Sequence, residues 1–252
     1  MELFIVTAAS FVAGFVDAIV GGGGLVLVPA MFATFPNAHP ATLFGVNKSA
    51  SMWGTAAAAW QFSRRVQLPW ASLFPSVVLA LLGSFIGAWL VTEVSPDFLR
   101  KALPVVLLAV LTYTVAKKDM GRTHSPLHNA TTERRIMCAL GLVIGFYDGF
   151  FGPGTGSFFV FAMVRWLGFD FLHASANAKV LNLASNMAAL TLFISTGHIW
   201  WHLVAFIAVA NVAGSLIGTR LALRHGAGFV RAAFIVVVAL LILKTAWDAY
   251  VL

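Results

Sequence analysis

The 252-residue sequence is short of charge and almost devoid of cysteine. Only 10% of its residues are charged and 60% are hydrophobic, whereas soluble domains carry roughly 25% charge. Its mean hydropathy is +0.90. Cys138 is the single cysteine, which excludes an internal disulfide and a multi-cysteine metal site. These shortages exclude a soluble globule and predict a protein embedded in the lipid bilayer.

Signatures of several other protein classes are also missing. Met1 and Glu2 lead directly into an apolar segment without the basic region of a secretory signal, so we expect this segment to be retained. The net charge of +7 comes from basic residues at segment ends, as membrane topology requires, and not from a nucleic-acid-binding stripe. His124 and His128 lack a cysteine or carboxylate framework. We therefore expect no nucleic-acid partner, no cofactor and no metal.

The hydrophobic residues fall into segments of membrane-spanning length. Six of them reach about 20 residues and run approximately 41–63, 70–92, 98–116, 171–196, 199–221 and 227–247. Two more, 3–35 and 134–167, are interrupted by glycine. We predict an all-α polytopic membrane protein with about eight hydrophobic segments. Its expected parts are transmembrane repeat 1 (1–118), a polar linker (119–133) and transmembrane repeat 2 (134–252).

An internal duplication relates the two halves. An offset of 131 residues lays Asp17 on Asp148 and Lys48 on Lys179. The same offset lays 83–87 (GSFIG) on 214–218 (GSLIG). Duplicated apolar chains are typical of secondary transporters, whose substrate site lies at the repeat interface near mid-bilayer.

Charge at the segment ends favours one topology. If each glycine-broken segment enters and returns as a hairpin, the repeats are inverted, and most basic residues share the linker side; if each crosses once, the bias nearly vanishes. With hairpins, the shared side holds Arg64, Arg65, Lys117, Lys118, Arg122, Arg134, Arg135, Arg165, Arg220, Arg224 and Arg231, opposite Arg100, Lys101 and Lys244. We therefore predict inverted repeats with a cytoplasmic linker and both termini outside. Trp53 and Trp89, deeper than the other tryptophans, are expected to pack between helices.

The glycine breaks predict an anion site. Each precedes an apolar helix, starting at Leu25 in one half and at Ser157 in the other. A helix N-terminus offers free N–H groups and a partial positive charge, and glycine lets a ligand approach the backbone. The predicted loop residues are Gly21, Gly22, Gly23, Gly24, Gly152, Pro153, Gly154, Thr155 and Gly156. The alternative is that these glycines serve only tight turns and helix packing.

Charged residues within the spans are the second functional signal. Asp17, Asp148, Lys48 and Lys179 are expensive in lipid and are expected to pair, each aspartate with the lysine of its own repeat. The pairs either lock the broken helices, or the lysines attract an anion while an aspartate exchanges a proton. An aspartyl protease site is disfavoured, and no enzyme is expected. Polar neighbours complete the predicted substrate site, namely Asn47, Ser51, Asn182 and Asn186.

Four stretches resemble a known family. They are GFVDAIVGGGGLVLVPAM (14–31), GVNKSAS (45–51), GFYDGFFGPGTGSFF (145–159) and NAKVLNLASN (177–186). Both halves resemble the sulfite exporter TauE/SafE family, most closely its YfcA-like branch. The resemblance implies an inner-membrane permease for sulfite, sulfoacetate or related anions. The functional positions that it implies are Asp17, Gly21, Gly22, Gly23, Gly24, Asn47, Lys48, Asp148, Gly152, Pro153, Gly156, Lys179 and Asn182.

The sequence thus predicts a secondary transporter in the bacterial inner membrane. Its expected partners are a small anion, of organosulfonate or sulfite type, and the lipid bilayer. Alternating access, with possible proton coupling, is the expected mechanism. The alternative is a membrane channel or scaffold without a transport cycle.

Overall fold

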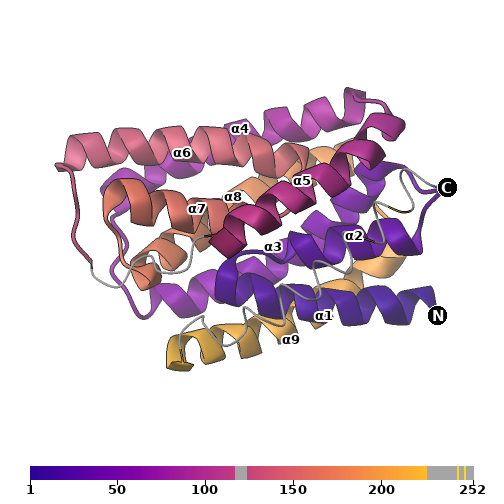
Figure 1. Cartoon of the computed structure of the whole chain (residues 1–252), viewed down its shortest axis with the longest axis horizontal. Coiled ribbons are helices and arrows are strands. Elements are labelled where there is room, and N and C mark those ends of the chain that lie inside the picture. Colours follow the sequence, from indigo (N-terminus) through magenta and orange to yellow (C-terminus); the bar gives the residue numbers. More distant parts are fainter. Residues whose placement is uncertain (117–123, 226–242, 244–246, 248–252) are drawn as a thin grey trace.

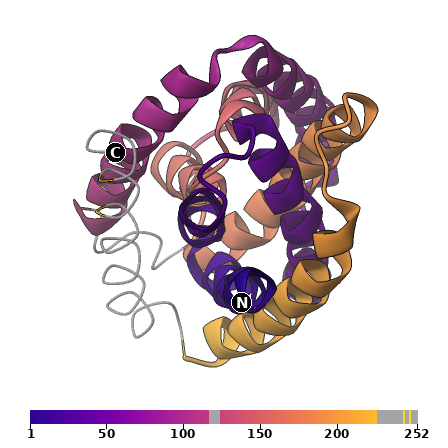
Figure 2. The same ribbon diagram turned by 90° about the vertical axis from the view of Figure 1, so that its right-hand side faces the viewer.

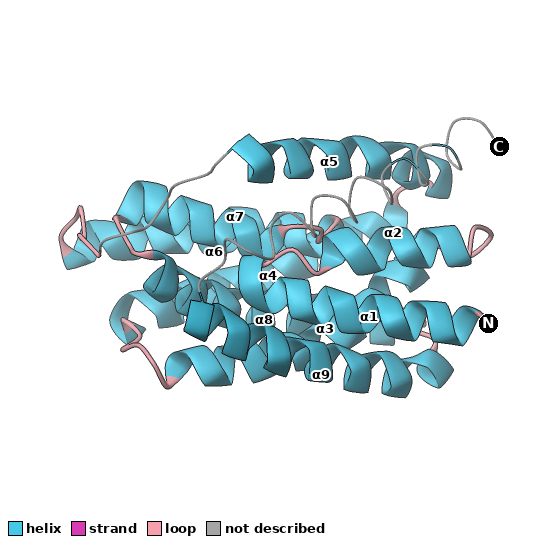
Figure 3. Cartoon of the chain, turned by 60° about the horizontal axis from the view of Figure 1, so that its bottom comes forward, coloured by secondary structure: helices cyan, strands magenta, loops and turns pink. Residues whose placement is uncertain are grey.

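The structure is a computed structural model that describes residues 1–116, 124–225, 243 and 247. Regular structure in these ranges is entirely helical (Figures 1 and 3). In chain order the helices are α1 (Glu2–Val20), α2 (Gly24–Thr34), α3 (Pro40–Ser63), α4 (Trp70–Glu93), α5 (Pro96–Ala116), α6 (Ala130–Phe150), α7 (Thr155–Ala162), α8 (Phe171–Ser195) and α9 (Trp201–His225). A π-helical stretch, Met163–Leu167, continues α7. The predicted span 227–247 lies outside the described residues, apart from 243 and 247.

Local sequence signals set the helix boundaries. Pro40 occupies the first turn of α3, where a missing N–H costs nothing. Asn129 caps α6 by accepting from the N–H of Thr132 at 2.9 Å, and Asp170 caps α8 by accepting from the N–H of His173 at 2.8 Å. Each glycine-broken segment became two helices, as the sequence predicts, and the second helix of each begins one or two residues earlier than expected.

Polar side chains lie inside the bundle and large apolar ones cover much of its outside. Buried residues include Asn47, Lys48, Asp148 and Lys179, while Phe74 and Val209 are among the exposed ones. Four described helices, α1, α4, α8 and α9, are long and apolar enough to cross a membrane. This distribution, the reverse of a soluble protein, confirms an all-helical polytopic membrane protein.

Two tryptophans do not lie where the sequence analysis placed them. Trp53 is 53% exposed and Trp89 is 52% exposed, so both lie on the outer surface. The expectation that they pack between helices was wrong. Depth along a helix does not determine which face a side chain occupies.

Each broken segment folds back on itself. In Figure 1, α1 runs away from the N-terminal end of the bundle and α2 returns toward it, whereas α6 and α7 do the same from the opposite end. The N–H of Ser125, before the second segment, donates to the carbonyl of Gly168, after it, at 2.9 Å. The segment therefore leaves and returns at the end that carries the linker. The placement of the two ends relative to a membrane stays a prediction.

The two halves are intertwined through close helix contacts. A Cβ on Gly83 or Gly87 of α4 would lie 2.1–2.2 Å from carbonyl oxygens of α6, and one on Gly214 or Gly218 of α9 would lie 2.0–2.4 Å from those of α1. Each contact recurs at the offset of 131 residues. Small residues allow this close approach. In the end view, α5 and α9 lie on the outside and α2 lies in the interior (Figure 2). The halves are thus not separate bodies.

Candidate functional site

The two glycine loops meet in the middle of the bundle. Gly21 ends α1 with a φ of +76°, and its carbonyl accepts from the N–H of Ser157 at 3.1 Å. A Cβ on Gly21 would lie 2.4 Å from the carbonyl carbon of Gly156, and one on Gly24 would lie 3.0 Å from Cα of Pro153. The loops can approach this closely because glycine has no side chain.

Two ion pairs flank the loops. Nζ of Lys48 lies 2.7 Å from Oδ1 of Asp148, and Nζ of Lys179 lies 2.9 Å from Oδ2 of Asp17. Lys179 also donates to the backbone carbonyl of Asp17. The expectation that each aspartate pairs with the lysine of its own repeat was wrong. The loops of the two halves face each other, and this brings each aspartate to the opposite lysine.

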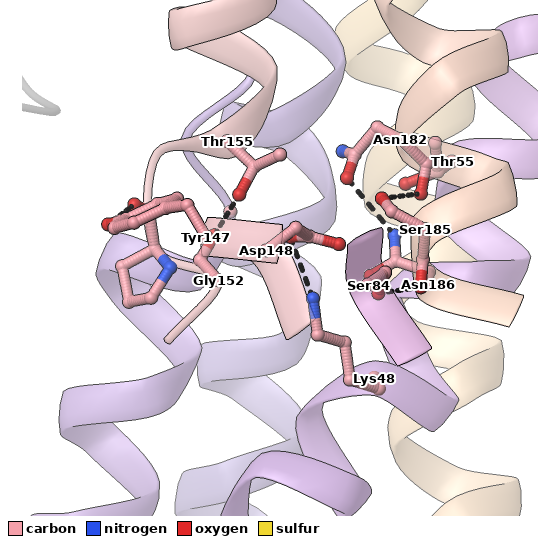
Figure 4. Close-up of polar contacts among 12 residues, drawn as sticks. Lys48, Thr55, Ser84, Tyr147, Asp148, Gly152, Thr155, Asn182, Ser185 and Asn186 are labelled. Carbon is pink, nitrogen blue, oxygen red and sulfur yellow. Dashed lines mark hydrogen bonds and ion pairs between the residues drawn. The ribbon is translucent and has the colours of Figure 1, made fainter. Parts of the chain in front are cut away.

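The two aspartates have different surroundings. The carboxylate of Asp17, whose side chain is 15% exposed, also accepts from the N–H of Gly23 at 3.3 Å and from the hydroxyl of Thr55 at 3.4 Å. The side chain of Asp148 is only 2% exposed, and its Oδ2 has no protein donor among the described residues. Figure 4 shows Lys48 reaching from α3 toward this carboxylate. Asp148 therefore depends on a single lysine.

A small cavity lies between the loops and the ion pairs. Most of the predicted site residues line it, namely Asp17, Gly21, Gly24, Asn47, Lys48, Ser51, Asp148, Gly152, Gly154, Thr155, Gly156, Asn182 and Asn186. Asn182 and Asn186, which are hydrogen bonded to each other at 3.4 Å, come from α8 (Figure 4). The cavity measures about 10 Å³, which is the space of about one water molecule. The site is closed in this structure.

The remaining predicted residues stand just behind the cavity wall. Gly23 and Lys179 bind the carboxylate of Asp17. The carbonyl of Pro153 accepts from the hydroxyl of Tyr147 at 2.6 Å, and that of Gly22 accepts from Leu25 at 3.0 Å. These residues position the loops, so their direct contact with a substrate stays a prediction.

Two residues of the site, Thr55 and Tyr147, are not among those predicted from the sequence. Thr55 lies seven positions after Lys48, which places both on one face of a helix, and this spacing was a usable signal. Tyr147 stabilises the second loop through Pro153 and adjoins Asp148. Its role has no signal in the sequence because an aromatic residue in an apolar span is ordinary.

Groups of the protein already occupy the helix N-termini. The carboxylate of Asp17 lies at the start of α2, and the carbonyl of Gly21 accepts an N–H in the first turn of α7. The glycine breaks in the sequence predict a ligand anion in this position. The N–H of Gly23, the hydroxyl of Thr55 and the ammonium of Lys179 are thus already bound to an internal carboxylate.

A second polar cluster lies at the linker end. Ligand atoms of His124, Asp170 and His173 lie within 4.8 Å of one another, a grouping that can hold a metal ion. The sequence alone groups His124 with His128 and predicts no metal there. Burial raises the pKa of Asp170, but its hydrogen bonds from His173 outweigh this and hold that pKa below its ordinary value. Capping of α8 accounts for the bond from the backbone N–H of His173, and the imidazole Nδ1 of His173 pairs with the same carboxylate at 2.9 Å.

A pair of histidines closes the opposite end. The rings of His39 and His198 stack with centroids 4.9 Å apart, and Nδ1 of His198 lies 3.1 Å from the hydroxyl of Thr42. Burial, and then the neighbouring His39, lower the pKa of His198. The loop after α8 is thus held against the start of α3 by a neutral imidazole.

Fold and site together define an integral membrane protein with a polar, ion-paired interior. The sequence profile of the family described as sulfite exporter TauE/SafE matches residues 6–245. The chain belongs to this family, which confirms the resemblance seen in its motifs. No solved structure matches the chain.

Several related proteins are named as membrane transporters. The probable membrane transporter protein ORF9 of Sinorhizobium sp. is 35% identical over 230 residues, which cover 91% of this chain and 86% of the relative. The probable membrane transporter protein YfcA of Escherichia coli K12 is 33% identical over 241 residues, covering 96% and 88%. A probable membrane transporter protein of Haemophilus influenzae is 32% identical over 250 residues, covering 98% and 95%. The chain is a membrane transporter.

Proposed function

We propose that this protein is a secondary transporter of a small anion, a sulfite-like oxyanion or an organosulfonate, in the bacterial inner membrane. The observation that supports it is the pair of buried lysines, Lys48 and Lys179, on either side of the glycine loops. Buried cations in a membrane protein mark substrate or ion pathways. The family description adds sulfite as the candidate substrate.

The aspartates act in this proposal as exchangeable counter-ions. When the site is empty of substrate, Asp148 neutralises Lys48 and Asp17 neutralises Lys179. Protonation of a carboxylate removes its negative charge and leaves the lysine to bind the incoming anion. Release of the anion returns the lysine to the aspartate, which then loses its proton. Anion binding and proton binding are thereby coupled.

Alternating access follows from the closed cavity. A space of about 10 Å³ does not hold an oxyanion of several heavy atoms, so the loops must separate before binding. Each ion pair joins one half to the other, and breaking a pair loosens the contact between the halves. Substrate binding and opening thus involve the same bonds.

Thermal stabilisation of the purified protein tests the proposal. Sulfite, sulfoacetate and sulfate are added as sodium salts, with choline chloride at matched ionic strength as the control. A bound anion at about 100 times its Kd adds about 2.7 kcal/mol, which raises the melting temperature by about 5–10 °C for a chain of this size.

Variants of the two buried lysines test whether the stabilising anion binds at the ion-paired site. Lys48→Ala and Lys179→Ala should abolish the shift, while Arg134→Ala, which removes an exposed arginine from the first turns of α6, should keep it. Folding of each variant is checked by gel filtration. A full shift in well-folded variants of both lysines would contradict the assignment. If no anion stabilises the protein and none crosses proteoliposomes, the assignment of a sulfite-like or organosulfonate substrate is refuted.

A further inference from the structure

A large cavity opens at the linker end of the bundle. It measures about 1050 Å³ and is walled by the ends of α3 and α9 and the start of α8. Four arginines, Arg64, Arg65, Arg220 and Arg224, line this vestibule, together with one carboxylate, that of Asp170. A cleft lined mainly by one sign of charge concentrates the opposite ion. The vestibule therefore attracts anions.

Side-chain contacts hold residues of the vestibule wall in place. Nδ1 of His124, within the linker, lies 3.9 Å from Oδ2 of Asp170 on the vestibule wall. Arg64 lies over the ring of Trp60 at 4.4 Å, which holds its guanidinium along the wall. The positive charge of Arg64 is thus held in place on the vestibule wall.

A small apolar cluster separates the vestibule from the Asp17–Lys179 ion pair. Its buried members are Ala18, Ile19, Ala58, Phe62, Ala176 and Ala222, and we call them the plug. Phe62 also lines the vestibule, so it lies at the boundary between the two. Ile19 follows Asp17 by two residues at the tip of the first hairpin. The barrier between charged site and vestibule is therefore thin.

Helical spacing shows how thin the plug is. On α3, Thr55, Ala58 and Phe62 share one face, which leads from the hydroxyl bound to Asp17 to the vestibule wall. On α8, Ala176 lies one turn before Lys179 on the same face. On α3 the plug therefore spans Ala58 to Phe62, about one turn or roughly 6 Å, and Thr55 lies about one further turn inside.

The duplication does not repeat the vestibule at the other end. At the offset of 131 residues, the four arginines correspond to Ser195, Thr196, Trp89 and Glu93. Phe193, the counterpart of Phe62, lies in a much larger apolar cluster to which α2 and α5 contribute. Gly45 is pressed against the loop before α9, where a Cβ would come within 2.1 Å of the carbonyl oxygen of His198. Among the described residues, the other end is closed by more packing, and the positions that match the four vestibule arginines carry no arginine.

We propose that the vestibule collects small oxyanions on the linker side of the membrane, and that Phe62 with Ile19 forms the gate between the vestibule and the ion-paired site. The proposal rests on anion transport as the proposed function and deepens it, because it names the entrance and the residues that close it. Opening this gate requires displacement of about one turn of packing, whereas the opposite end requires a larger rearrangement.

A cysteine at Leu223, on the vestibule wall, tests the charge selectivity in a chain with Cys138 replaced by alanine. Phosphatidylcholine vesicles are treated from the linker side with an ethylsulfonate or a trimethylammonium methanethiosulfonate, and each rate is divided by that of a free thiol. We expect the anionic reagent to react at least about tenfold faster. Replacing all four arginines by glutamine should abolish this preference. The double variant Arg64→Gln with Arg220→Gln should only reduce it. Arg134→Gln with Arg135→Gln, at the same end but outside the vestibule, should keep it.

Three results would refute the proposal that the vestibule collects oxyanions. They are equal rates for the two reagents, an equal loss of preference in the Arg134/Arg135 control, and a preference that disappears when the vesicles contain phosphatidylglycerol. The last result would assign the arginines to lipid headgroups.

The gate is tested with a cysteine at Thr55, which lies behind the plug. Phe62→Ala should raise its modification rate from the linker side at least tenfold, Phe62→Leu should raise it less, and Phe193→Ala should not change it from that side. An unchanged rate in Phe62→Ala, or an equal increase from both sides, would overturn the gate. The assay needs no transport, so charge-selective access without any anion flux would refute the proposed function alone, and flux without selective access would refute the vestibule alone.

Discussion

The two ion pairs are equivalent in sequence but should respond differently to loss of their lysines. In Lys48→Ala, Asp148 keeps a buried negative charge whose Oδ2 has no other protein donor among the described residues. Breaking a buried pair in this way costs about 3–5 kcal/mol. In Lys179→Ala, Asp17 keeps the Gly23 N–H and the Thr55 hydroxyl and is partly exposed. Hydrogen bonds to a charge contribute about 1.5–3 kcal/mol each when well formed.

The retained donors of Asp17 are long, at 3.3 and 3.4 Å, so they offset the loss of Lys179 by only about 1–2 kcal/mol. One kcal/mol corresponds to about 2–4 °C in melting temperature at this chain length. We therefore expect Lys48→Ala to melt about 6–20 °C below the wild type, and Lys179→Ala to lose several degrees less. The measurement is thermal unfolding of the purified protein in one detergent, without added oxyanion.

A double variant distinguishes the cost of an unpaired buried charge from the cost of lost side-chain packing. Lys48→Ala with Asp148→Ala should recover much of the loss, because no uncompensated charge remains. Arg134→Ala is the control for removal of a positive charge from the surface. Equal destabilisation by the two lysine variants, or a double variant no more stable than Lys48→Ala, would refute the different roles assigned to the two carboxylates.

Three further predictions concern the loops, the topology and pH. Gly21→Ala should prevent stable folding, whereas Gly197→Ala, with the same φ of +76° but open space around it, should cost only the left-handed strain of about 1–2 kcal/mol; comparable melting temperatures would contradict the loop contact. Single cysteines at Ser125 and Arg224, in an otherwise cysteine-free chain, should both resist an impermeant thiol reagent outside intact cells, and labelling of only one would refute the hairpins. Because the pKa of His198 is lowered, its stabilising contribution is present above the unfolded value of about 6.5 and is lost as pH falls below it. Wild type should therefore lose more stability than His198→Asn between pH 7.5 and 5.5, and parallel pH profiles would refute this.

The sequence by itself determined the class of protein and most of the candidate site. Composition alone excludes a soluble fold, since so few charges cannot cover a water-exposed surface. The duplication indicates that Asp17, Lys48, Asp148 and Lys179 are candidate functional residues, because charge within a membrane span is costly unless it is paired. Helix breaks at Gly21 and Gly152 were visible because glycine adopts positive φ without strain.

Only the tertiary structure decided which groups meet. Periodicity places a residue on a helix face, but it does not determine which helix packs on that face, so the exchange of aspartates between the halves was not predictable. For the same reason Trp53 was misplaced. The vestibule also depends on three helix ends brought together from α3, α8 and α9. Sequence patterns report local conformation and the cost of burial, whereas the choice of partners depends on shape and close contact between segments far apart in the chain.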